Sequence, residues 1–165
     1  MAIVTEHIIN ELQGKFGNGL SRFEQPYQLL TFTATRENIM QVLEYLYTHP
    51  DFQMQFLTDL CAVHYPDDKQ IVVVYHVHSL VHNFRVRIKV ILPEDKPVIA
   101  TATKLFSAAN WMERETYDFF GVKFEGHPNL KRILNVDDMV AFPMRKEYPL
   151  EDPNRIDKND SYFGR

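Results

Sequence analysis

The sequence predicts an α+β domain of two layers, in which a mainly antiparallel sheet has its helices on one side. Helical and strand-like segments follow one another in the order α-β-β-α-β-β-β, which is typical of such domains. Residues 82–92 alternate apolar and basic side chains, so one face of that strand is expected to be buried and the other to meet water or a partner. With 165 residues, of which 45% are apolar, the chain can build one core.

Composition excludes several classes of function. The net charge of −4 gives no general attraction to nucleic acid or anionic lipid. A chain whose single cysteine is Cys61 has no internal disulfide and no site built from several cysteine ligands, such as an iron–sulfur cluster. Cys61 lies within an apolar strand and is expected to act as a small buried hydrophobe. No nucleotide-binding glycine motif is present.

The N-terminus shows no targeting signal, because acidic residues stand where a secretory or transit peptide would be basic. No apolar run approaches the roughly 20 residues needed to cross a bilayer. We therefore expect a protein of the reducing cytoplasm, held at any membrane by its partners.

The first half of the chain contains two helices and two short strands. Residues 5–16 repeat apolar side chains at helical spacing, with Thr5 as the expected N-cap and glycines at the end. Residues 20–24 and 28–34 read as strands, and residues 35–48 as the second helix, which the following His-Pro-Asp stops.

Three longer strands are expected next, at residues 52–65, 70–79 and 82–92. Residues 99–106 are expected to form a short helix. A further helix over residues 108–120 would be capped by Ser107 and ended by Gly121. Beyond it, four prolines at about ten-residue spacing predict extended segments and turns: Pro128, Pro143, Pro149 and Pro153. The expected division is a sheet domain (1–98), a helix region of the same domain (99–121) and an extended partner-binding segment (122–165).

The histidines of the second long strand are one candidate metal site. His76 and His78 are two apart on a strand, so they share a face, and His82 or His64 could join them. No carboxylate at a suitable spacing accompanies them. The structural interpretation, polar residues on a sheet face, is therefore favoured over a metal enzyme.

The charged stretch of the 108–120 helix is a second candidate. Arg114 and Asp118 are four residues apart and are expected to pair, whereas Glu115 and Asp118 crowd one another. With Glu113, these acids could perform acid–base chemistry, form ion pairs on a solvated helix, or face a partner protein. Without a nucleophile or a phosphate loop, the last two interpretations are favoured.

The segment from Gly126 to Leu134 combines a turn with basic and apolar residues. Gly126, His127 and Pro128 predict a rigid turn, after which Lys131 and Arg132 could hold acidic groups. Packing on the same domain and docking on a partner use the same residue types, so both interpretations stay open.

These residues resemble the signature of the C subunit family of respiratory complex I. The similarity covers about forty contiguous residues and is carried by the following stretches: Glu113-Arg114-Glu115, Tyr117-Asp118-Phe119-Phe120-Gly121, Phe124-Glu125-Gly126-His127-Pro128, Arg132-Ile133-Leu134, Phe142-Pro143-Met144-Arg145-Lys146 and Tyr148-Pro149-Leu150. In the third strand, Leu57-Thr58-Asp59-Leu60 is similar as well. The resemblance does not assign a role to residues 154–165.

The resemblance implies a small hydrophilic subunit of the peripheral arm of proton-pumping NADH–quinone oxidoreductase. Such a subunit has no catalytic residue and no cofactor or metal of its own, since FMN and the iron–sulfur clusters lie in other subunits. It binds the large quinone-site subunit (the D subunit), with the B subunit and other cluster-bearing subunits nearby. The absence of a presequence favours a bacterial protein, peripheral to the cytoplasmic side of the cell membrane.

The resemblance also implies which residues meet partners. They are Glu113, Arg114, Glu115, Asp118, Gly126, His127, Pro128, Arg132, Arg145 and Lys146. Two alternatives remain: the equivalent subunit of a membrane-bound nickel–iron hydrogenase or formate hydrogenlyase, and a stand-alone metal-dependent enzyme that uses His76 and His78.

Overall fold

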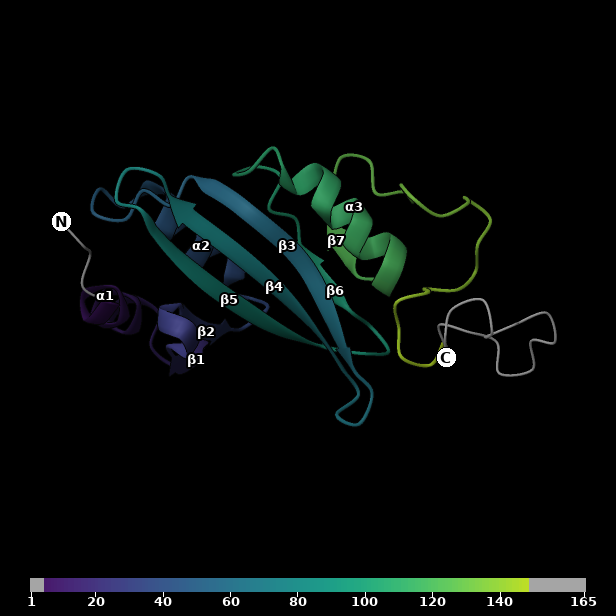
Figure 1. The fold of residues 1–165 in the computed structure, drawn as a ribbon, viewed down its shortest axis with the longest axis horizontal. Helices are drawn as coiled ribbons and strands as arrows, with labels where there is room; N and C mark the ends of the chain where they lie inside the picture. Colours follow the sequence, from purple (N-terminus) through teal and green to yellow (C-terminus); the bar gives the residue numbers. More distant parts are fainter. Residues whose placement is uncertain (1–4, 149–165) are drawn as a thin grey trace, which may run out of the picture.

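The chain forms a five-stranded sheet, a two-stranded sheet and three α-helices within residues 5–148, the part that the computed structural model describes (Figure 1). The elements in chain order are α1 (Thr5–Phe16), η1 (Gly17–Gly19), β1 (Leu20–Glu24), η2 (Pro26–Gln28), β2 (Leu30–Ala34), α2 (Ile39–Thr48), β3 (Phe56–Tyr65), β4 (Gln70–Ser79), β5 (Phe84–Pro93), β6 (Val98–Ala100), α3 (Ala109–Phe120) and β7 (Lys123–Glu125).

The larger sheet has the strand order β1-β2-β5-β4-β3. Every neighbouring pair is antiparallel except β2 and β5, which are parallel. The connection between these two strands runs through α2, β3 and β4, and a parallel pair requires such a long crossover. This mixed sheet with its helices confirms the predicted α+β class with mainly antiparallel pairing.

The two faces of the sheet differ as the alternation predicted. Val86, Ile88 and Val90 of β5 are fully buried and belong to one core with the apolar stripes of α1 and α2. Arg85, Arg87 and Lys89 point to the opposite face, which we call the open face. Figure 1 shows α2 behind the sheet and α3 beside the edge strand β3.

Two predicted boundaries were wrong by about four residues. The strand predicted from Phe52 starts only at Phe56, because the N–H groups of Phe52 and Gln53 donate to the carbonyl of His49 and close a turn there. The helix predicted from Thr35 starts at Ile39, since residues 35–38 form a turn first.

The short helix predicted at residues 99–106 was also wrong. Residues 98–100 form β6, which pairs in parallel with β7, a strand that the sequence did not reveal. A turn follows, in which Leu105 and Phe106 donate to the carbonyl of Ala102. Burial of Ile99 and Phe124 stabilises this small sheet, and such tertiary burial outweighs local propensity.

The two ends of α3 test the predicted caps. Ser107 provides no side-chain cap to this helix, whereas Gly121 ends it as predicted, in the left-handed conformation with φ = 76°. No helix among residues 5–148 is both long and apolar enough to cross a bilayer. The predictions for Pro149, Pro153 and residues 154–165 lie outside the described residues, as does part of the predicted 122–165 segment.

Candidate partner interface: α3 and the C-terminal segment

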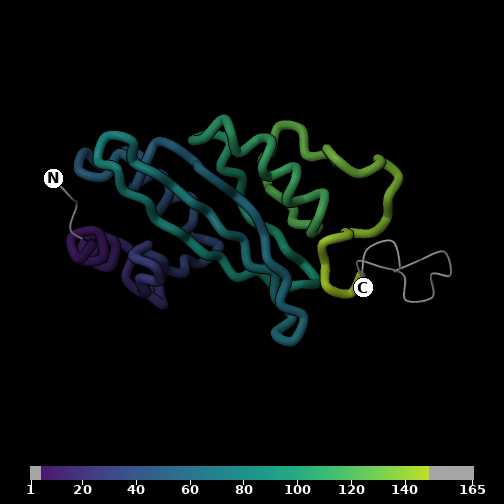
Figure 2. The backbone as a smooth tube through the Cα atoms, viewed as in Figure 1, coloured from purple at the N-terminus to yellow at the C-terminus, as the bar shows by residue number. Residues whose placement is uncertain are grey.

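Residues 126–148, here called the C-terminal segment, follow β7 and pass around α3 (Figure 2). Three positions of α3 that are spaced four residues apart face this segment: Asn110, Arg114 and Asp118. The backbone carbonyl of Asn110 lies 3.0 Å from Nε2 of His127. Arg114 donates to the carbonyls of Lys131 and Arg132, at 3.1 and 2.8 Å. Asp118 is the third position, and a spacing of four places all three on one side of the helix.

Asp118 is a buried acceptor that organises the middle of the segment. Its Oδ2 accepts the N–H groups of Ile133, Leu134 and Asn135 at 3.1, 2.8 and 2.9 Å. Its Oδ1 accepts from Arg132 at 2.6 Å and from the side chain of Asn135 at 3.0 Å. Burial opposes ionisation, but these donors outweigh it and hold the pKa of Asp118 far below its ordinary value of 3.8. The group is therefore a carboxylate at neutral pH.

Arg132 is the counterpart of Asp118. Besides the Asp118 side chain, its guanidinium donates to the Asp118 carbonyl at 2.9 Å and to the carbonyls of Met139 and Ala141. Both members of the pair are buried. A buried ion pair is tolerated only when such further hydrogen bonds satisfy it. Arg132 thus fixes the path of the segment against α3.

The C-terminal end of α3 is completed by the same segment. The last four carbonyls of a helix have no partner within the helix. Here Tyr117 accepts from the N–H of Gly121, and Asp118 accepts from Arg132. Phe119 accepts from the N–H of Met144, and Phe120 accepts from Nε of Arg145 at 2.8 Å.

The two arginines also bring positive charge to the negative end of the helix dipole. Their guanidinium groups lie 5.2 and 5.1 Å from the centre of the Phe142 ring. Phe142 in turn lies on Gly121, where an added Cβ would be only 2.7 Å from the ring.

Gly121→Ala is expected to lower the free energy of unfolding by about 1–3 kcal/mol, because the new methyl group collides with Phe142 and the backbone has a positive φ. Urea unfolding followed by circular dichroism measures this. Gly14→Ala in α1 is the matched control, since nothing lies within 4 Å of its Cβ position, and it should stabilise by about 0.5–1 kcal/mol. Equal effects of the two changes would contradict this account of Gly121.

The predicted pairing of Arg114 with Asp118 was wrong. Arg114 instead binds main-chain carbonyls and lies 5.4 Å from the Trp111 ring, while Asp118 pairs with Arg132. The four-residue spacing would allow Arg114 to contact Asp118. However, Arg132, 14 positions after Asp118, offers it a shorter and buried ion pair.

Glu113 lies on another side of α3 and is fully buried. Its two carboxylate oxygens accept from the Thr101 hydroxyl and the Ala102 N–H, both at 2.6 Å. Burial raises the pKa of Glu113 to about 7, although these two hydrogen bonds act in the opposite direction. It ties α3 to the chain after β6.

The other predicted interface residues are exposed or intermediate in burial. Glu115 and the side chain of Lys146 face solvent, while the Lys146 N–H donates to Nδ1 of His64 at 2.9 Å. Gly126 and Pro128 are exposed, and His127 is half-buried. By contrast, the polar groups of Glu113, Arg114, Asp118 and Arg132 are directed into their own domain, so the contacts that we observe for these four are within the chain.

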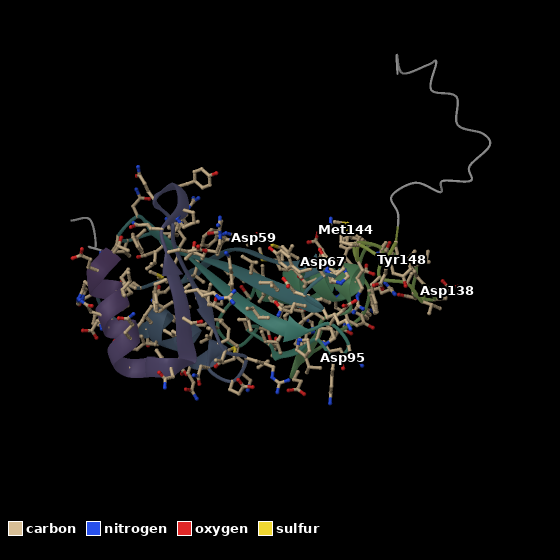
Figure 3. All side chains as sticks on the ribbon, turned by 90° about the horizontal axis from the view of Figure 1, so that it is seen from below. Asp59, Asp67, Asp95, Asp138, Met144 and Tyr148 are labelled. Carbon is tan, nitrogen blue, oxygen red and sulfur yellow. The ribbon has the colours of Figure 1, made fainter. Side chains whose placement is uncertain are left out.

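The outward side of the C-terminal segment carries several exposed apolar side chains. Leu134, Val136 and Val140 are 65%, 63% and 93% exposed. Met144 and Tyr148 are also exposed, and Figure 3 shows both side chains at the end of the molecule that carries the segment. This surface therefore combines exposed aliphatic side chains with exposed charges such as Asp138 and Lys146, above the buried pair of Asp118 and Arg132.

The histidines predicted as a metal alternative share a face of the sheet but not a ligand sphere. Nε2 of His76 accepts from Arg87 at 2.8 Å, and its Nδ1 lies 3.4 Å from Asp59. Nε2 of His76 is thus occupied by a protein donor and is not available to a metal. Cys61 is only partly buried, contrary to expectation, yet burial and the nearby Asp59 raise the pKa of its thiol to about 11, which makes it unreactive.

One group of potential ligands does occur in residues 5–148, formed by His64, Glu94 and Glu147. However, Nδ1 of His64 accepts the Lys146 N–H, which places the ring proton on Nε2, 3.2 Å from Glu94. A metal ligand requires the opposite arrangement, with the second nitrogen donating outward. The group is better described as a hydrogen-bonded tie between β3 and the C-terminal segment.

Sequence reasoning missed several members of the site. Asn135 has no local pattern that marks it, Phe142 was noted only as part of the family resemblance and not for its contacts with arginine, and Thr101 precedes its partner Glu113 by 12 residues. The sequence indicated a pairing within α3 and left open whether residues 126–134 pack on their own domain.

Comparison with known proteins places these features in a family. The family described as the 30 kDa subunit of respiratory-chain NADH dehydrogenase matches residues 32–154. The C subunit of NADH-quinone oxidoreductase from Citrifermentans bemidjiense is 42% identical over 94% of this chain and 93% of the relative. That of Trichlorobacter lovleyi is 37% identical, covering 98% and 97%.

Two solved structures are similar. A trypsin-resistant fragment (1–134) of Nqo5 has a TM-score of 0.64 at 29% identity and covers 76% of this chain and 98% of the fragment. A chain of an archaeal membrane-bound sulfane sulfur reductase has a TM-score of 0.72 at 25% identity, covering 88% and 85%. The sequence matches extend over most of the chain, and it therefore belongs to the family of the respiratory-chain NADH dehydrogenase 30 kDa subunit.

Proposed function

We propose that this chain is a structural and assembly subunit of the peripheral arm of a proton-pumping NADH–quinone oxidoreductase, complex I. In that complex, electrons pass from NADH through FMN and iron–sulfur clusters to quinone, and all of these cofactors belong to other subunits. The chain docks on the quinone-site D subunit, close to the B subunit, at the cytoplasmic side of a bacterial cell membrane. Membership of the family and the names of its relatives support this proposal.

The observation that carries the proposal is the group of exposed aliphatic side chains on the outer side of the C-terminal segment. Exposing Leu134, Val136 and Val140 to water is unfavourable, and such a concentration of exposed apolar side chains in one short segment is typical of a protein–protein contact. An open hollow between α3 and the segment is lined by apolar residues, Val140 among them, and by the charged Lys131, Arg132 and Asp137. It offers a partner both apolar and charged groups to contact.

The buried polar contacts prepare this surface for binding. A segment without helix or strand would ordinarily lose conformational entropy on docking. Here Asp118 and Arg132 already fix five backbone groups of residues 133–141, so less order remains to be imposed. Their role in the proposed interface is therefore to position neighbouring residues, while Glu115 and Lys146 remain free to meet a partner directly.

The proposal assigns no chemistry to this chain. The thiol of Cys61 is held protonated, and Nε2 of His76 accepts a hydrogen bond from Arg87. These observations support a role without catalysis or a resident cofactor, and they disfavour the stand-alone metal enzyme.

The first experiment is purification of the tagged chain from membranes in mild detergent, followed by a quinone reductase assay with NADH. The expected result is a large assembly that contains flavin and iron–sulfur clusters and is inhibited by quinone analogues. Recovery of the chain alone would contradict the proposal.

Arg132→Ala and Arg145→Ala are each expected to lower the yield of this assembly about tenfold, the effect of losing about 1.4 kcal/mol of binding free energy. Both changes release carbonyls at the end of α3 and loosen the C-terminal segment, whereas the sheet is built from other residues. Circular dichroism of the isolated variants should therefore retain the strand signal. Lys96→Ala, on an exposed turn, is the control. Normal assembly of both arginine variants would argue against the proposed interface.

A second candidate is the equivalent subunit of a related membrane complex, such as a nickel–iron hydrogenase or formate hydrogenlyase. The structural similarity to a chain of a sulfane sulfur reductase complex supports keeping it, because one fold serves in more than one respiratory assembly. Nickel in the purified assembly, with hydrogenase activity in place of NADH oxidation, would select this candidate.

A further inference from the structure

His64 joins the end of the C-terminal segment to β3, the edge strand of the larger sheet. Its side chain is fully buried, and its Nδ1 accepts the backbone N–H of Lys146 at 2.9 Å, 82 positions later in the chain. Within residues 5–148, no residue after Lys146 donates a backbone hydrogen bond to another element. We call the contact between Nδ1 of His64 and the N–H of Lys146 the His64 tie.

The His64 tie depends on the protonation state of the ring. A neutral imidazole has one N–H donor and one acceptor nitrogen, whereas a protonated imidazole has two donors and no acceptor. Because Nδ1 accepts here, the neutral ring carries its proton on Nε2. A second proton on Nδ1 would point at the N–H of Lys146, so two donors would face each other and the hydrogen bond would be lost.

The surroundings of the ring can hold its positive charge. Nε2 lies 3.2 Å from Oε1 of Glu94 without a well-aligned hydrogen bond, and Glu147 completes a group whose polar atoms all lie within 4.8 Å of one another. Two carboxylates favour a charged ring, whereas burial and the ammonium group of Lys146 oppose it. On the adjoining elements, β4 places Ile71 opposite His64, and α3 forms no ion pair with His64 among the described residues. A protonated ring would therefore exchange the Lys146 N–H for a carboxylate.

We propose that the His64 tie is a pH-dependent switch at the end of the C-terminal segment, in which neutral His64 holds Lys146 and protonation of Nδ1 releases it. Histidine is the side chain whose charge ordinarily changes between about pH 5 and 8, so the tie is closed at the upper end of this range and open at the lower end. Opening loosens the stretch that carries the exposed side chain of Tyr148. An effect on docking rests on the proposed function, whereas the switch itself is a property of this chain.

Glu113 changes stability with pH in the opposite direction. Its pKa of about 7 lies above the ordinary value of 4.5, so its contribution weakens the fold as pH rises. A loss of order that appears as pH falls toward 5 therefore does not come from Glu113.

NMR spectroscopy of the isotope-labelled full chain between pH 8 and pH 5 tests the switch. The ring nitrogen shifts of His64 report the proton on Nδ1, and hydrogen exchange relative to the intrinsic rate at each pH reports the Lys146 amide. Protection of this amide should fall about tenfold toward pH 5, the effect of losing one hydrogen bond, with the same midpoint as the ring. The Gly121 amide, which donates to Tyr117, should not lose protection in this direction. Equal protection of Lys146 at both pH values, or a ring that stays neutral at pH 5, would overturn the inference.

His64→Asn separates titration of the ring from other effects of pH. The side-chain oxygen of Asn can accept in place of Nδ1 and gains no proton in this range, so protection of the Lys146 amide should not vary with pH. His7→Asn, at an exposed position of α1, is the control and should show the same loss as wild type. A loss in His64→Asn equal to that of wild type would show that another group opens the tie, and would exclude His64 as the switch.

Washing the immobilised assembly at pH 8 and at pH 5.5 measures the effect on docking. Retention of the wild-type chain should be about threefold to tenfold lower at pH 5.5 than that of His64→Asn, because a loosened segment must be ordered again on binding. Equal retention of the two chains at pH 5.5 would contradict regulation of docking by His64. Failure of the chain to enter any assembly would instead reject the proposed function, and the NMR result would still decide the switch.

Discussion

Asp118→Asn is expected to lower the free energy of unfolding by about 3–5 kcal/mol, the cost of breaking a buried ion pair on one side. Asn could still accept the three backbone N–H groups of residues 133–135 with its carbonyl oxygen. Its amide group would then face the Arg132 guanidinium and the Asn135 side chain, so donors would meet donors. Urea unfolding monitored by circular dichroism measures the difference.

Asp138→Asn is the matched control, because Asp138 is an exposed acid in the same segment (Figure 3). It should change stability by no more than about 0.5 kcal/mol. An Asp118→Asn variant as stable as this control would show that the ion pair does not hold the C-terminal segment in place.

The low pKa of Asp118 makes the stability of the fold depend on pH. A carboxylate whose folded pKa lies below its unfolded value stabilises the fold above the unfolded value, here 3.8. That contribution is lost as pH falls further toward the folded pKa. Between about pH 5 and 8 the contribution of Asp118 to stability is constant, which distinguishes it from the contribution of Glu113.

Glu113 is expected to make the fold less stable as pH rises. Its folded pKa of about 7 lies above the unfolded value of 4.5, so the folded chain holds the proton more tightly in this interval. The contribution of Glu113 is fully favourable below pH 4.5 and is lost as pH rises through 7. At about 1.36 kcal/mol per pKa unit, the loss between pH 5 and pH 8 is about 2–3 kcal/mol.

Comparing Glu113→Gln with wild type isolates the pH-dependent contribution of Glu113, because the histidines are the same in both proteins. The Gln amide can donate to Thr101 as a protonated acid would, and its carbonyl can accept the Ala102 N–H. Wild type and variant should therefore have similar stability at pH 5, whereas the variant should be more stable by about 2–3 kcal/mol at pH 8. The exposed Glu115→Gln should follow wild type at both values. A difference between wild type and Glu113→Gln that does not vary with pH would refute the raised pKa.

The parts of the fold that were predictable from sequence are those with strict periodicity. Alternation in β5 correctly gave the buried and open faces, and the glycine signal correctly ended α3 at Gly121. Predictions failed where a tertiary contact decides the structure. β6 forms because β7 pairs with it from 25 residues away, and β3 starts late because His49 accepts two backbone N–H groups.

The arrangement of the candidate site was not predictable from the sequence. The family resemblance selected residues of α3 and the C-terminal segment as partner contacts, and that role stays a prediction. The sequence did not reveal that Asp118, Arg114 and Arg132 would face inward while Leu134 and Val140 face outward. Which side of an irregular segment is buried depends on its long-range hydrogen bonds, and such a segment has no period from which sequence could indicate it.

The end of α3 has a consequence for the order in which the protein is made. Phe120 receives its hydrogen bond from Arg145, 25 positions later, so α3 emerges from the ribosome before the residues that complete it have emerged. Until then, the carbonyls of Phe119 and Phe120 have only water as a partner, and the last turn can fray. A nascent chain that stops before residue 144 would carry a sheet with an unfinished α3, detectable as faster hydrogen exchange at the Gly121 amide. α3 is therefore complete only after the C-terminal segment, which carries the proposed docking surface, has been made.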